Sequence, residues 1–201
     1  MNIDWDSLDG VVFDFGGVMT VSPVNGVWER TLYPFCAKFG LGREAVLDGF
    51  RRFRILWDSD DVTFEEFWSL VFEHAGRPRP TAAAFAELKR FDAGGWTDTL
   101  RPETLELMRE TRTLGKRVGI LSNMSSDFHR DFFAPRMGEY RALADMETIS
   151  GFERCCKPCR RLYDIARERM GAPASRLLFL DDSPANVLAA RTYGWQSELY
   201  P

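Results

Sequence analysis

Residues 11–17 read VVFDFGG, an apolar run that is interrupted only by Asp14 and then followed by two glycines. A run of this kind is typical of a strand buried on both faces, and the glycines favour a sharp turn directly after it. Similar apolar runs occur at residues 118–121 and 177–180, and polar residues follow each of them. The sequence therefore predicts three buried strands with polar side chains at their ends.

Helical patterns lie between and after these strands. They cover Pro102–Leu114, Arg160–Met170 and Pro184–Tyr193, and a glycine stands just past the end of each. Glycine favours the left-handed backbone that ends many helices, and proline suits a first helical turn. Strands that alternate with helices predict an α/β fold, in which a parallel sheet has helices on both faces.

Residues 21–95 break this alternation, because they show helical periodicity and no convincing strand. Their clearest helix begins after Thr63, with Glu66 three residues later as the second member of a capping box. The aromatic stripe of this helix is more typical of a small core of its own than of a ligand pocket. We therefore predict a core of residues 1–20 and 96–201 that is interrupted by a small all-helical insertion at residues 21–95.

The composition and net charge indicate what kind of molecule the protein binds. The 201 residues, 45% of them hydrophobic, suffice for one core with an elaboration rather than for two ordinary domains. The formal net charge of -4 comes from 26 basic and 30 acidic residues spread along the chain, so no surface for nucleic acid is predicted. We expect a small-molecule partner, and the sequence leaves the oligomeric state open.

The N-terminal residues and the cysteines indicate a compartment. Met1–Gly10 carries three Asp and no basic residue, unlike a secretory signal, and no apolar run is long enough to span a membrane. Adjacent Cys155 and Cys156 poorly suit a disulfide framework, which favours reduced thiols. Cys156 and Cys159 have the spacing of half a zinc site, but the sequence has no second such pair. We expect no zinc, no membrane association and a cytoplasmic location.

Three carboxylates stand at the ends of predicted strands. Asp14 belongs to the first strand, and Asp181 and Asp182 follow the last of the three runs. A carboxylate in such a place is costly unless hydrogen bonds or a cation compensate it, and neighbouring carboxylates raise one another's pKa. Mg²⁺ is the natural cation, because it accepts carboxylates, water and a substrate phosphate as ligands. A structural Asp14 bonded to loop amides is the alternative.

A hydroxyl, an amide and an ammonium complete the set of polar residues. Ser122 and Asn123 follow the second strand and precede a helix predicted from about residue 126, so they could cradle a phosphate. Alternatively, Ser125 or Ser126 merely caps that helix. Lys157 could neutralise a phosphate, although a lysine in a loop is usually just solvated.

In this order, the polar stretches resemble the motifs of the haloacid dehalogenase superfamily. These motifs are an Asp nucleophile after the first strand, a Ser or Thr after the second, a Lys ahead of a helix, and an acidic pair after a later strand. The resemblance covers the whole chain, and its most specific part runs from Lys157-Pro158 to the stretch FLDDSPANV at residues 179–187. It implies a Rossmann-like core in which residues 21–95 form a helical cap.

The resemblance also implies a Mg²⁺-dependent phosphatase that hydrolyses a small phosphorylated metabolite through an aspartyl-phosphate. Asp14 would attack phosphorus, Lys157 would offset charge, and Asn186 would support the acidic loop. The implied catalytic residues are Asp14, Ser122 and Lys157; the implied phosphate-binding residues are Ser122, Asn123 and Lys157. The implied metal ligands are Asp14, the carbonyl of Gly16, Asp182 and, directly or through water, Asp181.

One residue departs from the pattern of many phosphatases in this superfamily. They have a second Asp two residues after the nucleophile as general acid and base, and here that position is Gly16. Glycine has no proton to give, so turnover is expected to be slow, limited to good leaving groups, or assisted by a group from the cap. Two alternatives follow: a metal-independent haloacid dehalogenase, and a binding protein that kept the fold. The acidic pair argues against the dehalogenase, because it would repel a carboxylate substrate.

The substrate is not fixed by the sequence. Several cap residues could contact it, although a solvated basic helix face is the more ordinary explanation of the arginines. These residues are Trp28, Arg30, Arg51, Arg52, Arg54 and Trp57.

Overall fold

A parallel sheet of five strands lies at the centre of the part of the chain that the structure describes. The structure is a computed structural model that describes residues 3–21, 32–97 and 99–200. The strands are β1 (Gly10–Phe13), β2 (Arg117–Ser122), β3 (Met146–Ile149), β4 (Leu177–Asp181) and β5 (Gln196–Leu199), in the order β3-β2-β1-β4-β5. Every residue of β1 and β4 is buried, which explains why these strands read as continuous apolar runs.

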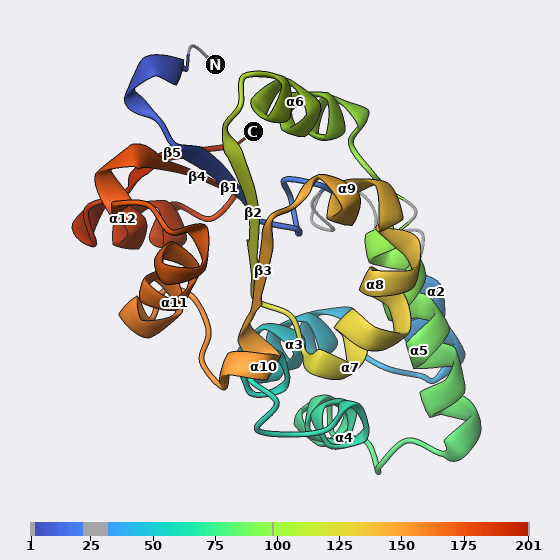
Figure 1. Cartoon of the computed structure of the whole chain (residues 1–201). Helices are drawn as coiled ribbons and strands as arrows, with labels where there is room; N and C mark the ends of the chain where they lie inside the picture. Colours follow the sequence, from blue (N-terminus) through green and yellow to red (C-terminus); the bar gives the residue numbers. More distant parts are fainter. Residues whose placement is uncertain (1–2, 22–31, 98, 201) are drawn as a thin grey trace.

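Helices cover both faces of this sheet, as predicted (Figure 1). On one face α6 (Pro102–Thr113) packs against β1 and β2 and is joined there by α9 (Gly138–Leu143). On the other face α11 (Arg160–Met170) packs against β2 and β3, and α12 (Pro184–Thr192) packs against β4 and β5. The predicted α/β fold is confirmed, and the ends of its three main helices lie within one residue of the predicted ones.

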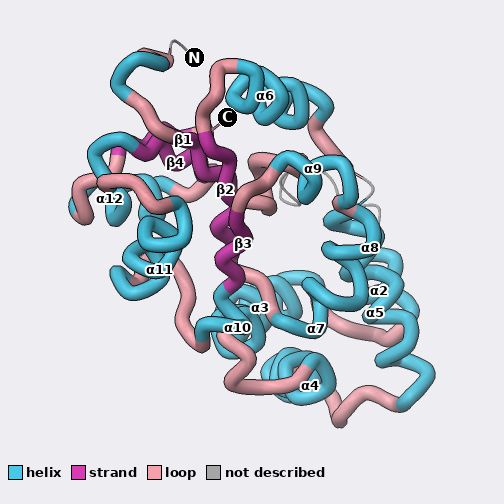
Figure 2. The backbone as a smooth tube through the Cα atoms, viewed as in Figure 1, coloured by secondary structure: helices cyan, strands magenta, loops and turns pink. Residues whose placement is uncertain are grey.

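The described residues 32–97 of the insertion form helices joined by loops and contain no strand (Figure 2). Its helices are α2 (Leu32–Lys38), α3 (Arg43–Asp58), α4 (Phe64–His74) and α5 (Ala82–Thr97). The capping box of Thr63 and Glu66 is present at the start of α4. α5 continues two residues past residue 95. The predicted limits of core and cap stay predictions. Figure 1 shows α3 and α4 beyond the end of the sheet at which β2 and β3 finish.

The aromatic stripe of α4 forms the core of the insertion, as the sequence indicated. Phe67, Trp68 and Val71 are fully buried, and the Trp68 ring lies against the rings of Phe35 and Phe50. This cluster is continuous with the apolar side chains on one face of the sheet. The cap and the core are therefore held together by a shared hydrophobic interior.

Two strands and several short helices were not predicted. Strands β3 and β5 are the edges of the sheet, and β5 has the sequence QSEL, which contains no apolar run. Polar side chains are common on edge strands, and they remove the pattern by which a strand is recognised. The short elements are η1 (Trp5–Ser7), the π-helical turn η2 (His129–Phe133), α8 (Ala134–Arg136), α10 (Ser150–Glu153) and η3 (Ala174–Arg176), whereas α7 (Ser126–Phe128) starts where the sequence predicted a helix.

Among the described residues, no helix combines the length and the apolar character needed to cross a lipid bilayer. The cytoplasmic location stays a prediction.

Candidate active site

The polar residues at the ends of the strands meet at one edge of the sheet. Asp14 follows β1, Ser122 ends β2, and Asp181 ends β4, and these three strands are neighbours. The carboxyl ends of parallel strands lie on the same edge of a sheet, which is where α/β proteins bind ligands. Oxygens from the carboxylates of Asp14, Asp181 and Asp182 all lie within 4.8 Å of one another.

Lys157 lies between two of these carboxylates. Its Nζ is 2.9 Å from Asp14 Oδ1 and 2.7 Å from Asp181 Oδ2, and it donates to the carbonyl oxygen of Leu121 at 3.1 Å. Burial opposes the charge of the ammonium, but Asp14 and Asp181 outweigh burial and raise the pKa of Lys157. The side chain is 1% exposed, so the alternative of a merely solvated loop lysine is wrong.

Asp181 is fully engaged by protein donors. One oxygen, Oδ2, accepts from Lys157 and from Asn186 Nδ2, and the other, Oδ1, accepts from Asn186 Nδ2 and from the backbone N–H of Ser183. A carboxylate has about four lone-pair sites, and four contacts use them. The predicted support of the acidic loop by Asn186 is present, and Asp181 is better placed to orient Lys157 than to bind a metal directly.

The Asp182 carboxylate lies against the turn after β1. Gly17 has a φ of +76°, and a Cβ on it would come within 2.0 Å of Asp182 Oδ2. The turn therefore needs glycine both for its left-handed backbone and for the close approach of this carboxylate. Asp14, the carbonyl group of Gly16 and Asp182 together offer the hard oxygen ligands that suit Mg²⁺. The residues present thus fit the predicted metal.

Gly17→Ala is expected to disrupt this site more than the stability of the protein. Any residue other than glycine at such a φ costs about 1–2 kcal/mol, but at position 17 the new Cβ would also displace Asp182. We expect at least about a tenfold loss of hydrolase activity and a weaker response to Mg²⁺. Gly115→Ala is the matched control, because Gly115 has a φ of +71° with nothing within 4 Å of its would-be Cβ. Equal activity of the two variants would contradict the role given to Gly17.

Burial governs the ionisation of the nucleophile candidate. Desolvation raises the pKa of Asp14 to about 7, because it outweighs the opposing effect of Lys157, and the neighbouring charge of Asp181 adds to the rise. Desolvation and Asp181 likewise raise the pKa of Asp182. Carboxylates kept together in this way are stabilised in their charged form by a divalent cation.

Asp14→Asn is expected to change how stability depends on pH. The folded protein holds a proton on Asp14 up to about pH 7, whereas the unfolded chain releases it near the ordinary pKa of an aspartate, 3.8. This group therefore lowers the free energy of unfolding as pH rises between those values. In chelator, we compare the free energy of unfolding of Asp14→Asn with that of wild type. We expect this difference to shift in favour of Asp14→Asn by about 1–3 kcal/mol as the pH rises from about pH 5 to about pH 8. Urea unfolding of both proteins measures this change, and a stability difference that is the same at both pH values would contradict it.

Ser122 and Asn123 reach the site in different ways. The Ser122 side chain is buried and lines the cavity beside Asp14. The Asn123 side chain donates to the carbonyl oxygen of Lys157 at 3.0 Å and accepts from the Lys157 N–H at 2.7 Å. Its amide therefore holds the Lys157 loop in place, which the sequence did not indicate. Ser125, whose hydroxyl accepts from the N–H of Phe128, caps α7, as the alternative interpretation of this loop predicted.

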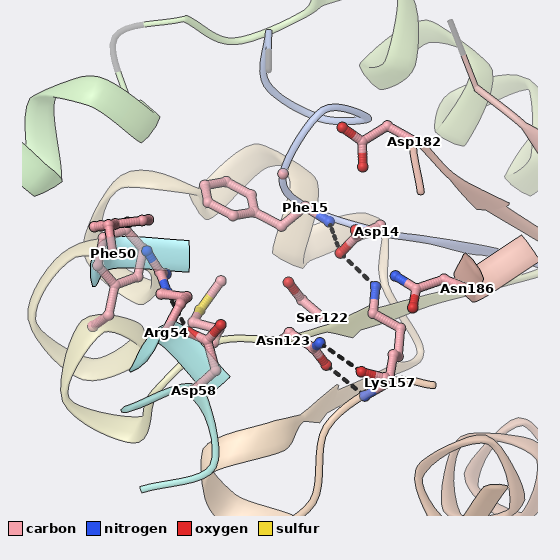
Figure 3. Close-up of a pocket in the computed structure, with 13 residues that line it drawn as sticks. Asp14, Phe15, Phe50, Arg54, Asp58, Ser122, Asn123, Lys157, Asp182 and Asn186 are labelled. Atoms are coloured by element: carbon pink, nitrogen blue, oxygen red, sulfur yellow. Dashed lines mark hydrogen bonds and ion pairs between the residues drawn. The ribbon is translucent and has the colours of Figure 1, made fainter. Parts of the chain in front are cut away.

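A cavity of about 210 Å³ opens above these residues (Figure 3). Its floor is formed by Asp14, Ser122 and Lys157, and its remaining wall carries Phe50, Arg54, Asp58, Met124 and Phe128 together with other residues of the core. This volume suits a small molecule rather than a polymer.

The wall contributed by the cap contains a polar pair. Arg54 Nε donates to Asp58 Oδ1 at 2.7 Å, and the Arg54 guanidinium lies 4.8 Å from the centre of the Trp57 ring. Arg54 was among the cap residues named from the sequence, but Asp58 was not. Both lie with Phe50 at a spacing of four residues on one face of α3, which is the signal that could have found them. Arg51 and Arg52 are exposed, while Trp28 and Arg30 lie outside the described residues.

The comparison with protein families identifies the fold. The family described as haloacid dehalogenase-like hydrolase matches residues 8–194. The chain belongs to this family. It is therefore a hydrolase of the haloacid dehalogenase (HAD) type, which confirms the family expected from the motifs. A curated relative, haloacetate dehalogenase H-2 of Moraxella sp. (strain B), is 28% identical over 97 residues, which are 47% of this chain and 42% of that protein.

Solved structures of two kinds share the fold of this HAD-like hydrolase. A HAD family enzyme from Bacteroides thetaiotaomicron, in complex with magnesium and inorganic phosphate, has a TM-score of 0.62 and 18% identity, covering 96% of this chain and 93% of that one. An L-2-haloacid dehalogenase from Xanthobacter autotrophicus, with chloropropionic acid covalently bound, has a TM-score of 0.64 and 19% identity, covering 94% of this chain and 76% of that one. At these identities the likeness concerns the fold.

Proposed function

We propose that this HAD-like hydrolase is a Mg²⁺-dependent phosphatase that hydrolyses a small phosphorylated metabolite through an aspartyl-phosphate on Asp14. The observation that carries the proposal is the charge of the site. When Asp14, Asp181 and Asp182 are all ionised, these three carboxylates and the ammonium of Lys157 carry a net charge of -2 (-3 + 1). An anionic substrate would be repelled from such a site unless a divalent cation neutralised it.

The site residues have complementary parts in this reaction. One oxygen of Asp14, Oδ1, is held by the ammonium of Lys157 and by the N–H of Phe15. The other oxygen is left to attack phosphorus. Ser122 and Lys157 would bind phosphoryl oxygens. Mg²⁺, held by Asp14, Asp182 and the carbonyl of Gly16, would supply charge neutralisation at the transferring phosphoryl group.

A haloacid dehalogenase is the second candidate. The names of the curated relative and of one of the structural neighbours favour it, and so does glycine at position 16. Asp182 argues against it, because its carboxylate faces the cavity beside Asp14, where a carboxylate substrate would have to bind without a cation. We therefore place the phosphatase first.

The experiment is a pair of assays on the purified protein. Release of phosphate from p-nitrophenyl phosphate and acyl phosphates is measured with Mg²⁺ and with chelator, beside release of halide from short haloacids. Phosphate release that requires Mg²⁺ supports the proposal. Halide release that persists in chelator would replace it with the dehalogenase, and the absence of both activities would leave a binding protein. A screen of phosphorylated metabolites then identifies the substrate, which we expect to be small enough for the cavity.

A further inference from the structure

The cap presents a carboxyl group to the cavity on the side away from the nucleophile. Phe50, Arg54 and Asp58 lie on one face of α3 and line the same cavity as Asp14. Figure 3 shows Arg54 and Asp58 on the far side of Ser122 from Asp14. In a phosphoryl transfer the attacking and leaving oxygens lie roughly in line, on opposite sides of phosphorus. A phosphoryl group attacked by Asp14 would therefore direct its leaving oxygen toward this face of α3.

The Asp58 carboxyl has one oxygen engaged and one available. Its Oδ1 accepts from Arg54 Nε at 2.7 Å, and among the described residues no donor is bonded to Oδ2. The Asp58 side chain is 9% exposed, so what remains open of it faces the cavity rather than bulk solvent. Arg54 thus fixes the rotamer of Asp58 while leaving one oxygen able to exchange a proton with a substrate.

Hydrogen bonds tie the end of α3 to the core, which fixes Asp58 relative to the floor of the site. The Ser150 hydroxyl donates to the carbonyl oxygen of Asp58 at 2.5 Å, and Trp57 Nε1 donates to Asp127 Oδ1 at 3.1 Å. Two residues further along, Asp60 Oδ1 accepts from the N–H of Ser126 at 2.9 Å. Asp58 is therefore positioned by segments of the core that follow β2 and β3, and not only by the cap.

We propose that Asp58 is the general acid and base of this enzyme and replaces the aspartate that Gly16 lacks. The inference rests on the proposed phosphatase function. In the first step Asp14 bonds to phosphorus, the bond from phosphorus to the leaving oxygen breaks, and the proton of Asp58 passes to that oxygen. In the second step water attacks phosphorus, Asp58 takes a proton from that water, and the bond to Asp14 breaks to release phosphate.

The surroundings of Asp58 are suited to a group that must both give and take a proton. Burial raises its pKa, while Arg54 on the same helix and Lys157 from the core loop lower it and Asp127 on α7 raises it. The result is a pKa above the ordinary value for Asp, so the protonated form persists closer to neutral pH.

The test is the dependence of Asp58→Asn on the leaving group. With a series of phosphate monoesters from p-nitrophenyl phosphate to simple alkyl phosphates, we expect a loss of about 10²–10⁴-fold in kcat/KM for alkyl esters. For p-nitrophenyl phosphate, whose leaving group departs without a proton, we expect less than about a threefold loss. Asp48→Asn is the matched control on α3, because Asp48 is exposed and pairs with His74 outside the cavity.

Several outcomes would overturn the inference. If Asp58→Asn lowered kcat/KM equally for every ester, Asp58 would have a binding or structural role instead. If the wild-type protein hydrolysed only the p-nitrophenyl ester, no general acid would operate. If wild type released no phosphate from any ester, the proposed function itself would fall. Arg54→Leu supplies an independent readout. Removal of this cation should shift the basic limb of the profile of kcat/KM against pH for alkyl esters to higher pH. A basic limb that stays at the same pH would contradict the proposal.

Discussion

Asp14→Asn is expected to abolish phosphate release from every ester that the wild-type protein hydrolyses, lowering kcat/KM by at least about a thousandfold. Asp14 directly follows β1, and its oxygens serve both the metal and the attack on phosphorus in our account. An amide removes the nucleophile and one anionic ligand together. Steady-state kinetics with excess Mg²⁺ measure the loss, and circular dichroism checks that the variant remains folded.

Asp164→Asn serves as the control, because Asp164 is a partly exposed residue of α11 that pairs with Arg160 away from the cavity. Retention of more than about a tenth of wild-type activity in Asp14→Asn would contradict a covalent role. A single turnover in ¹⁸O-labelled water separates the two candidate reactions further. Water that attacks phosphorus leaves the label in phosphate, whereas water that attacks the carbon of an Asp14 ester leaves it in the Asp14 side chain.

Lys157→Met is expected to have the largest effect on stability. It would leave the buried carboxylates of Asp14 and Asp181 without the ammonium that both contact. Removing one partner of a buried ion pair typically costs about 3–5 kcal/mol. We expect a loss of that order in the free energy of unfolding in chelator at about pH 8, and a near-complete loss of activity.

Added Mg²⁺ should recover part of the stability of Lys157→Met, because the cation offsets the same carboxylates. Lys38→Met is the comparison, since the side chain of Lys38 is 60% exposed and pairs with Glu87 at the surface, where such a pair contributes about 0–1 kcal/mol. Urea unfolding of both variants gives the answer. Similar small losses in the two would mean that the buried ammonium is not the partner on which Asp14 and Asp181 depend.

The central part of the site could be predicted because its residues are chemically conspicuous. Asp14, Asp181 and Asp182 stand next to apolar runs, where a carboxylate needs a compensating cation, and the order of the strands brings them together. The apolar runs themselves predicted the buried strands β1, β2 and β4. The edge strand β5 was missed because its four residues carry no pattern that distinguishes a strand from a loop.

Other features depend on contacts between distant segments and leave no local mark. Asn123 reads as a phosphate ligand beside Ser122, yet its side chain binds both backbone groups of Lys157, 34 residues away. Asp58 reads as one more charge near the end of an amphipathic helix. Only the fold shows that Asp58 lines the same cavity as Asp14, because Ser150 binds the last residue of α3 and Ser126 binds Asp60 just beyond it.

This arrangement explains how the enzyme works with glycine, which has no proton to give, at position 16. In our account the core keeps the nucleophile, the phosphate-binding groups and the metal ligands, and the cap supplies the proton. An enzyme so divided needs its cap to be held close to the core during the chemical step. The hydrogen bond between Trp57 and Asp127 and the shared hydrophobic interior meet this need.

The most direct test of the account is anomalous diffraction from crystals soaked with Mn²⁺ and inorganic phosphate. We predict one strong anomalous peak between Asp14 and Asp182, at about 2.0–2.3 Å from an oxygen of each carboxylate, with phosphate beside it against Ser122 and Lys157. Mn²⁺ that occupied other positions and left these two carboxylates without a shared ion would contradict the proposed metal-dependent phosphatase.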